Sequence, residues 1–306
     1  MRLNRRFLPR ALRACSLLAG LALLGACASG PQAPAAPVPV KPAREVAVAV
    51  TVSNQLISFN AATPGQLLWK RPLVGLQPGE SILGIDYRQK NDTLYALGSS
   101  GRLYTVDTED GKVTPVGAPF AVALQGDEFG FDFNPTVDRI RVVSSSGQNM
   151  RLHPDTGTVV DSSADQPGVQ TDGPLAFNPG DVNAGRAPRL VAAAYSYNKV
   201  DPKITTNFAI DQGTGSLVVQ GSREGVTPVV SPNTGRLDTV GPLNAGPFLS
   251  AAFDIHVLTD RAFAVLSGSA GAPSRWIEID LKTGAGRIIG TIAVGESLRA
   301  MALESF

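Results

Sequence analysis

The chain is poor in the residues that most often bind metals or attack substrates. It has two cysteines and two histidines among 306 residues. Cys15 lies in an N-terminal apolar run, and Cys27 follows that run. If the run is removed and Cys27 carries a lipid, no thiol remains, which excludes a disulfide framework, a thiolate metal site and a cysteine nucleophile. A zinc site on His153 and His256 would need further ligands that the sequence does not place, and a Ser-His-Asp triad stays an alternative without a Gly-x-Ser-x-Gly elbow to mark its serine.

An excess of positive charge is also missing. The chain has 27 basic and 26 acidic residues, and its first 26 residues hold five arginines and no acid. Without them, 22 basic and 26 acidic residues remain, which is a net charge of −4. Nucleic-acid binding favours basic surfaces, so we expect no nucleic-acid partner.

The apolar stretch from about Cys15 to Leu24 is too short to cross a bilayer as a stable helix. It follows an arginine-rich start and ends in small residues, which predicts a signal peptide over residues 1–26. The sequence Leu24-Gly25-Ala26-Cys27 resembles the lipobox of bacterial lipoproteins. That resemblance implies cleavage before Cys27, a diacylglyceryl thioether on its sulfur and N-acylation with a fatty acid such as palmitate. An ordinary secretory signal is the alternative.

From this leader we expect the protein in the bacterial cell envelope, attached to a membrane through the lipid on Cys27. Alanine rather than aspartate at position 28 favours the outer membrane, facing the periplasm. Frequent prolines between residues 27 and 45 forbid a helix and favour an extended polyproline II chain. We therefore expect a lipidated tether over 27–45 and a folded domain over 46–306.

After the tether, short β-type runs alternate with Gly, Pro, Asn and Asp, and no convincing amphipathic helix is present. One turn motif recurs, in which a glycine follows Asp, Asn or Thr by a few positions. Its glycines are Gly65, Gly111, Gly157, Gly215 and Gly284. The first three are 46 residues apart. Four strands in each 40–50 residues are typical of a β-propeller blade.

A second motif, seen for example in Gly84-Ile85-Asp86-Tyr87, predicts the innermost strand of each blade. These strands are expected at residues 84–87, 130–133, 175–177, 252–255 and 298–304. The long interval after 175 is interpreted as one enlarged blade with an inserted hairpin at 231–235. The sequence thus predicts an all-β propeller, with five blades favoured over six, closed by pairing between its N- and C-terminal strands. A pair of β-sandwiches is the alternative fold.

Several sequence motifs together resemble those of a bacterial family of propeller-like proteins, catalogued as domain of unknown function 4394. They are Gly130-Phe131-Asp132-Phe133-Asn134-Pro135, Asp138-Arg139-Ile140-Arg141-Val142-Val143-Ser144, Gln148-Asn149-Met150-Arg151-Leu152 and Thr239-Val240-Gly241-Pro242-Leu243. The resemblance covers about residues 46–304. It supports the propeller fold and implies no catalytic residues, because the family has no established activity.

The densest polar cluster is a candidate ligand site. Arg139 and Arg141 alternate with apolar residues, so both side chains point to one face of a strand. On a cleft wall they would grip a carboxylate or sulfate, whereas salt bridges between blades are the structural alternative. The full candidate set is Asp132, Asn134, Asp138, Arg139, Arg141, Asn149 and Arg151.

Asp86, Asp132 and Asp254 occupy equivalent positions in three predicted blades. They are candidate ligands for a divalent cation in the central channel, and local turn-capping is the alternative role. No other cofactor is evident. We expect a non-enzymatic binding or scaffold lipoprotein with an envelope protein or glycan as partner. The alternative is an enzyme, a metal-assisted hydrolase or lyase acting on glycans or lactones.

Overall fold

The computed structural model describes residues 44–269 and 272–305. The predicted signal peptide, Cys27 and all but the last two residues of the predicted tether lie outside the described residues. Among the residues described, no helix is both long and apolar enough to cross a membrane.

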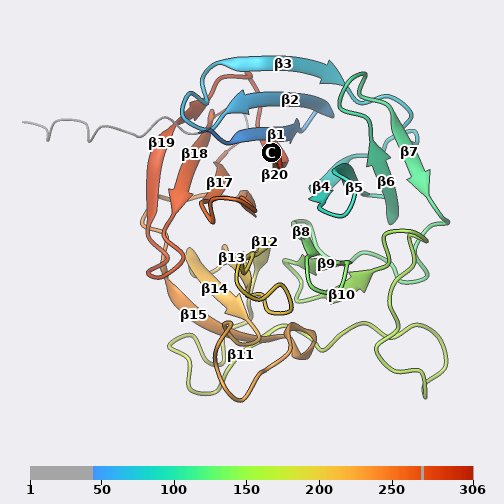
Figure 1. The fold of residues 1–306 in the computed structure, drawn as a ribbon, viewed down its shortest axis with the longest axis vertical. Coiled ribbons are helices and arrows are strands. Elements are labelled where there is room, and N and C mark those ends of the chain that lie inside the picture. The colour runs from blue at the N-terminus through green and yellow to red at the C-terminus, as the bar shows by residue number, and fades with distance from the viewer. Residues whose placement is uncertain (1–43, 270–271, 306) are drawn as a thin grey trace, which may run out of the picture. The chain divides into compact units, whose positions relative to one another are not determined.

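The folded part is a β-propeller of five blades around a central axis (Figure 1), as predicted. Blade 1 combines both ends of the described chain, in the order β20 (Leu298–Leu303), β1 (Val46–Thr51), β2 (Gln55–Asn60) and β3 (Leu67–Pro72). Blade 2 consists of β4 (Ile82–Arg88), β5 (Thr93–Gly98), β6 (Arg102–Val106) and β7 (Val113–Val116).

The remaining blades follow in chain order. Blade 3 has three strands, β8 (Phe129–Asn134), β9 (Arg139–Ser144) and β10 (Asn149–Leu152). Blade 4 has β12 (Leu190–Tyr195), β13 (Asn207–Asp211), β14 (Ser216–Gln220), β15 (Arg236–Pro242) and, outside β15, the short β11 (Ala176–Phe177). Blade 5 has β16 (Ser250–Ile255), β17 (Ala262–Ser267), β18 (Ser274–Ile279) and β19 (Gly286–Ile292).

Strand pairing between the two ends of the chain closes the ring, which confirms the prediction. β1 pairs antiparallel with β20, in a register that aligns Ala47 with Leu303 and Val50 with Ala300. Both strands are almost completely buried. The last strand of the chain therefore forms the innermost strand of the blade that the first strands complete.

Blade 4 corrects one part of the sequence prediction. Residues 175–177 were expected to form an innermost strand, but β11 lies at the outer edge of the blade, parallel to β15. The innermost strand is β12 instead. The turn motif led to this error, because Gly215 lies between the second and third strands of blade 4. In blades 1, 2 and 5 the glycine of this motif lies between the third and fourth strands.

The expected hairpin at 231–235 is present, because this segment belongs to the connection between the antiparallel neighbours β14 and β15. This segment forms the short 3-10 helix η1 (Pro232–Thr234), and Gly235 leads from it into β15. A Cβ on Gly235 would lie 2.2 Å from the Pro174 carbonyl oxygen. In blades 2 and 3, Gly111 and Gly157 make the same close approach, to backbone oxygens of the preceding blade at 2.2 and 2.0 Å.

These comparisons explain why the turn before an outer strand carries glycine. In blades 2, 3 and 5 this residue has positive φ and leaves no space for a side chain against the preceding blade, whereas Gly65 of blade 1 has neither feature. Gly215 has positive φ but nothing within 4 Å of an added Cβ. In blade 4 Gly235 makes the close approach instead, to Pro174 just before β11 at the outer edge of the same blade.

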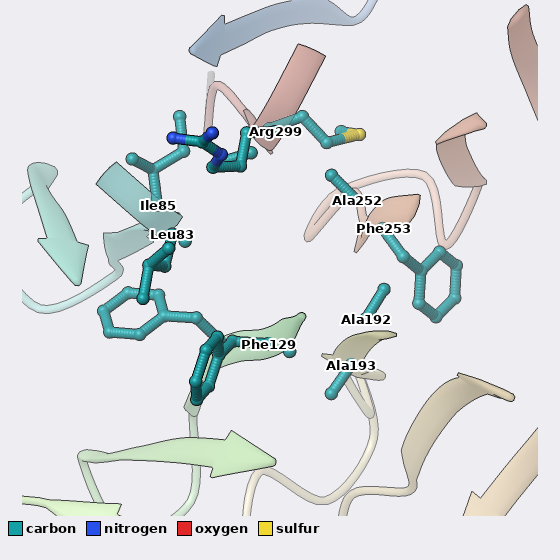
Figure 2. A pocket seen from close by; sticks show the side chains of 13 residues that line it. Leu83, Ile85, Phe129, Ala192, Ala193, Ala252, Phe253 and Arg299 are labelled. Atoms are coloured by element: carbon teal, nitrogen blue, oxygen red, sulfur yellow. The ribbon is translucent and has the colours of Figure 1, made fainter. Parts of the chain in front are cut away.

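Near the axis, the innermost strands approach so closely that only small residues fit on one face of them. A Cβ on Gly84 would lie 2.4 Å from the Phe131 Cβ, and one on Gly130 would lie 2.6 Å from the Ala193 nitrogen. The cavity left here is about 10 Å³, with Ala192 and Ala252 on its wall (Figure 2). That volume corresponds to about one water molecule.

Candidate functional site

Three aspartates converge in the centre of the propeller. Asp86 lies on β4, Asp132 on β8 and Asp254 on β16, all of them innermost strands. Their exposed fractions are 3%, 1% and 4%, and one carboxylate oxygen of each lies within 4.8 Å of those of the other two. Across the described residues, this is the only such group of three or more candidate metal ligands.

Backbone amides of the innermost strands hold these carboxylates in place. The Asp86 carboxylate accepts hydrogen bonds from the amides of Tyr87 at 2.7 Å and, in the next blade, Phe133 at 2.7 Å. The Asp132 carboxylate accepts from the amide of Tyr195 in blade 4 at 2.9 Å. Each bond between blades links one innermost strand to the following one.

Asp254 provides the third of these bonds between blades. Its carboxylate accepts from the amides of Ile255 and of Leu303 in blade 1, both at 2.6 Å. Blades 4 and 1 have alanine at the equivalent positions, Ala194 and Ala302. Where one blade has alanine at this position, the aspartate of the following blade accepts a hydrogen bond from the amide of the residue after it in the sequence. Three carboxylates thus satisfy five buried amides and use five of their six oxygens.

Crowding of three acids in a buried place favours their protonated forms. Burial, followed by the nearby charge of Asp254, raises the pKa of Asp86 well above its usual range. Burial raises the pKa of Asp132 well above its usual range, with added effects of Asp86 and Asp254, and raises the pKa of Asp254 to about 7. Tyr197 lies close enough that the three acids add to the rise in its pKa caused by burial. Such a group can hold protons or a hard cation through its oxygens.

The predicted polar cluster lies on blade 3, and the structure divides it. Asp132 belongs to the channel group. Asp138 turns away and forms an ion pair with Arg88 at 2.5 Å, and hydrogen bonding by that guanidinium lowers the pKa of Asp138. Asn149 is buried and donates hydrogen bonds to the carbonyls of Gly173 and Pro232. Asn134, Arg139, Arg141 and Arg151 remain together on the wall of one pocket.

Three arginines of this pocket share one face of the sheet. Arg139 and Arg141 alternate on β9, and Arg151 on β10 pairs directly with Arg141. Asp172 binds two of them, with distances of 2.5 Å to Arg141 Nη1 and 2.7 Å to Arg151 Nη2. The Asp172 side chain is 1% exposed. Among the described residues it is the only carboxylate within ion-pair distance of the three arginines.

Arg141 is a structural residue that joins two blades. Its guanidinium donates hydrogen bonds to Asn149 and Asp172, to Asn233 of η1 at 2.6 Å and to the Tyr195 hydroxyl at 3.3 Å. The side chain is 2% exposed. The alternative of salt bridges between blades therefore describes Asp138, which pairs with Arg88 of blade 2, while Arg141 and Asn149 are held by buried contacts within the protein.

Arg139 is different, because it has no carboxylate partner. Its Nη1 donates to the backbone carbonyls of Asp138 at 2.8 Å and Val137 at 3.4 Å, both in the turn between β8 and β9. Within the described part of the chain, Nε and Nη2 of Arg139 make no hydrogen bond. This guanidinium is available to a molecule in the pocket.

The pocket has a volume of about 370 Å³ and lies between blade 3 and blade 4. That size is suited to a small molecule. It is lined by Asn134, Val137, Arg139, Arg141, Arg151, Val160, Tyr195, Ser231, Pro232 and Asn233.

Hydrogen-bond donors are left free around this pocket, whereas most acceptors are used. The Asn134 side-chain oxygen accepts from the amide and hydroxyl of Thr136, and the Asn233 side-chain oxygen accepts from Arg141. The side-chain NH₂ groups of both asparagines, and Nη1 of Arg151, have no partner among the described residues. The lining is therefore complementary to a molecule rich in acceptors.

Sequence reasoning missed Asp172, Tyr195 and Asn233. Asn233 lies 92 residues after Arg141 and Tyr195 lies 54 after it. No local pattern connects residues at such separations. The unusual turn around Asn233 was the one available signal, but it was interpreted only as a hairpin.

The fold and these contacts define a five-bladed propeller with buried channel carboxylates and an arginine-lined pocket between two blades. Residues 55–302 match the family described as Domain of unknown function (DUF4394), and the chain belongs to this family. No curated protein matches the chain.

One solved structure that the chain resembles is a structural genomics protein of unknown function from Bacteroides thetaiotaomicron. The two share 13% sequence identity with a TM-score of 0.43, over 83% of this chain and 63% of the other. This chain thus spans less than two thirds of the length of that protein.

Proposed function

We propose that this protein is a non-enzymatic binding module of the bacterial cell envelope that recognises a small anion in the pocket between blades 3 and 4. The observation that carries this proposal is the set of free donors around Arg139. Three arginines face one carboxylate there, and the oxygens of Asn134 and Asn233 already accept hydrogen bonds within the protein. An anion supplies the missing acceptors and balances the excess positive charge.

The test compares ligands of matched shape and different charge. Benzoate, phenyl sulfate and phenyl phosphate are titrated into the protein by calorimetry, with neutral benzyl alcohol as reference. We expect at least one anion to bind and benzyl alcohol not to bind. Arg139→Gln should weaken anion binding about tenfold or more, since a charge-assisted hydrogen bond contributes roughly 1.5–3 kcal/mol.

Arg186→Gln is the matched control, because Arg186 is an exposed arginine outside the pocket. It should leave anion binding unchanged. Thermal unfolding of both variants verifies that they remain folded. If none of the three anions binds, or if Arg139→Gln binds them as well as the wild type does, the proposed function is wrong.

The proposal includes a lipid anchor on Cys27 and a location at the outer membrane, facing the periplasm. The lipobox-like sequence and the proline-rich segment after it support this placement. Labelling of growing cells with an alkyne analogue of palmitate should tag the wild type. Cys27→Ser should remain untagged and leave the membrane fraction; tagging of that variant would contradict lipidation at Cys27. An envelope protein or glycan is the expected source of the bound anionic group.

A second candidate function rests on the channel aspartates. Three carboxylate oxygens within 4.8 Å of one another can ligate a divalent cation, as an enzyme of the metal-assisted hydrolase or lyase class requires. Metal analysis of protein purified without chelators tests this candidate. About one equivalent of metal, lost in Asp132→Ala, would support it, whereas a metal content that the substitution does not change would contradict it.

A further inference from the structure

We infer that the ligand of the pocket is a small organic phosphate monoester bound as its dianion. This inference rests on the proposed function and specifies the class of anion. Three observations lead to it: the charge of the pocket, the number of elements that supply donors, and the apolar residues beside them.

The charge of the pocket favours a dianion. Arg139, Arg141 and Arg151 carry three positive charges, and Asp172 balances one of them. A net charge of +2 remains on one sheet face, where Arg151 pairs with Arg141 and Arg139 lies two residues before Arg141 on the same strand. A carboxylate or a sulfate monoester neutralises one unit of this charge. A phosphate monoester carries nearly two negative charges at neutral pH and neutralises both units.

The donors come from several directions. Arg139 lies on β9, Arg151 on β10, Asn134 at the end of β8, and Asn233 within η1. The Tyr195 hydroxyl on β12 accepts a hydrogen bond from Arg141 and retains its own proton for donation. Five elements of two blades therefore surround the pocket with donors. A planar carboxylate offers two oxygens to one fork, whereas a phosphate monoester offers three terminal oxygens to groups on different sides.

The pocket also has room and apolar surface for an organic group. Val137, Val160 and Pro232 line it beside the arginines, and its volume is about 370 Å³. Val137 is 55% exposed in the turn that holds Arg139. A bare inorganic ion would leave these side chains without contact. A phosphate attached to a compact ring or chain would cover them.

Three matched aromatic anions test this inference at pH 7.5. We expect phenyl phosphate to bind at least tenfold more tightly than phenyl sulfate and benzoate. Because its second ionisation lies near pH 6, its dianion falls to about a tenth of the total at pH 5. Binding of phenyl phosphate should therefore weaken several-fold between pH 7.5 and pH 5.

Phenyl sulfate is the internal control for the protein, because its charge does not change over this pH range. In the described part of the chain, the charged and titratable groups that line the pocket are the three arginines and Tyr195, and Asp172 binds two of these arginines; a change in any of them would also alter the binding of phenyl sulfate. Arg139→Gln should reduce the preference for phosphate over sulfate, and Arg186→Gln should preserve it.

Two results would separate this inference from the proposed function. If phenyl sulfate or benzoate binds as tightly as phenyl phosphate, the site recognises anions but the inferred class is wrong. The inference is equally wrong if phenyl phosphate binding does not follow its own ionisation. Absence of binding by all three anions would instead overturn the proposed function, and this inference with it.

Discussion

Asp86 and Asp254 each bind two backbone amides, one of a sequence neighbour and one of the next blade. At this position on the innermost strands, the side chain decides how adjacent blades are joined. Alanine at 194 and 302 is tolerated because the aspartate of the following blade satisfies the amide that would otherwise lack an acceptor. The acids are therefore needed in the structure whether or not they hold a cation.

Replacing Asp86 tests this role. Asp86→Ala leaves the buried amides of Tyr87 and Phe133 without acceptors, and we expect a loss of about 2–5 kcal/mol in the free energy of unfolding. Asp86→Asn keeps one acceptor oxygen and removes a charge from the group, so its loss should be smaller. Urea unfolding of both variants measures the difference. An equal loss in both would contradict the hydrogen-bond explanation.

At the scale of elements, the innermost strands determine how tightly the blades meet. Gly84 and Gly130 provide the closest approaches, because a Cβ at either position would overlap the neighbouring strand. Alanine occurs at the matching position on the other three innermost strands. Small residues at this level let five blades converge around a cavity of only about 10 Å³.

Gly130→Ala tests this packing. Its Cβ would lie 2.6 Å from the backbone nitrogen of Ala193, which cannot move without shifting β12. We expect a loss of about 1–3 kcal/mol, the usual cost of overpacking. Gly180→Ala is the control, because an added Cβ there meets nothing within 4 Å. Thermal unfolding compares the two; equal stability of both variants would show that the centre adapts freely.

The electrostatics of the whole propeller predict an unusual pH dependence of stability. Burial raises the pKa of the three channel aspartates, and burial with the nearby Asp127 raises the pKa of Glu128 to about 7. An acid whose pKa is higher in the folded state binds more protons folded than unfolded. Its contribution to stability is therefore greatest at low pH and is lost as the pH rises toward the folded value.

We expect the free energy of unfolding to fall by at least about 2–3 kcal/mol between pH 5 and pH 7.5, which is the contribution of a single acid whose pKa is about 7, since each unit of pKa difference corresponds to about 1.4 kcal/mol. Below pH 4 the sign reverses, because ion-paired acids such as Asp138 have lowered pKa values. Urea unfolding across this range, in the presence of EDTA, measures the effect. Asp132→Asn should weaken the dependence; stability that rises steadily from pH 5 to 7.5 would contradict protonation of the group.

The same measurement without EDTA distinguishes protons from a cation. A divalent ion stabilises ionised carboxylates, so a bound ion would make stability rise with pH. If the pH dependence of stability is the same with and without EDTA, protonation alone relieves the repulsion among the three carboxylates.

Much of the fold could be predicted because its signals are local. The glycine turns, the alternation within strands and the spacing of 46 residues between Gly65, Gly111 and Gly157 led to five blades and to closure by the chain ends. Blade 4 could not be placed in the same way. Its turn motif lies between the second and third strands, one strand earlier than in the other blades. Only the packing of β11 beside β15 shows where the blade begins and ends.

The candidate site was predicted in part. The alternation of Arg139 and Arg141 correctly indicated a shared face, and the equivalence of the three aspartates brought them to one channel. The sequence could not show which arginine is fully engaged in contacts within the protein and which is available to a ligand. That difference depends on Asp172, whose carboxylate reaches Arg141 and Arg151 but not Arg139.

By itself the sequence determined an all-β repeat and its closure and favoured five blades over six, because turn chemistry and strand alternation act over a few residues. Tertiary structure alone decided that three carboxylates serve five amides and that a donor-rich pocket opens between blades 3 and 4. Asp132 meets Tyr195 across 63 residues, and Arg141 meets Asn233 across 92. Contacts at that separation form only when neighbouring blades pack, so no local pattern encodes them.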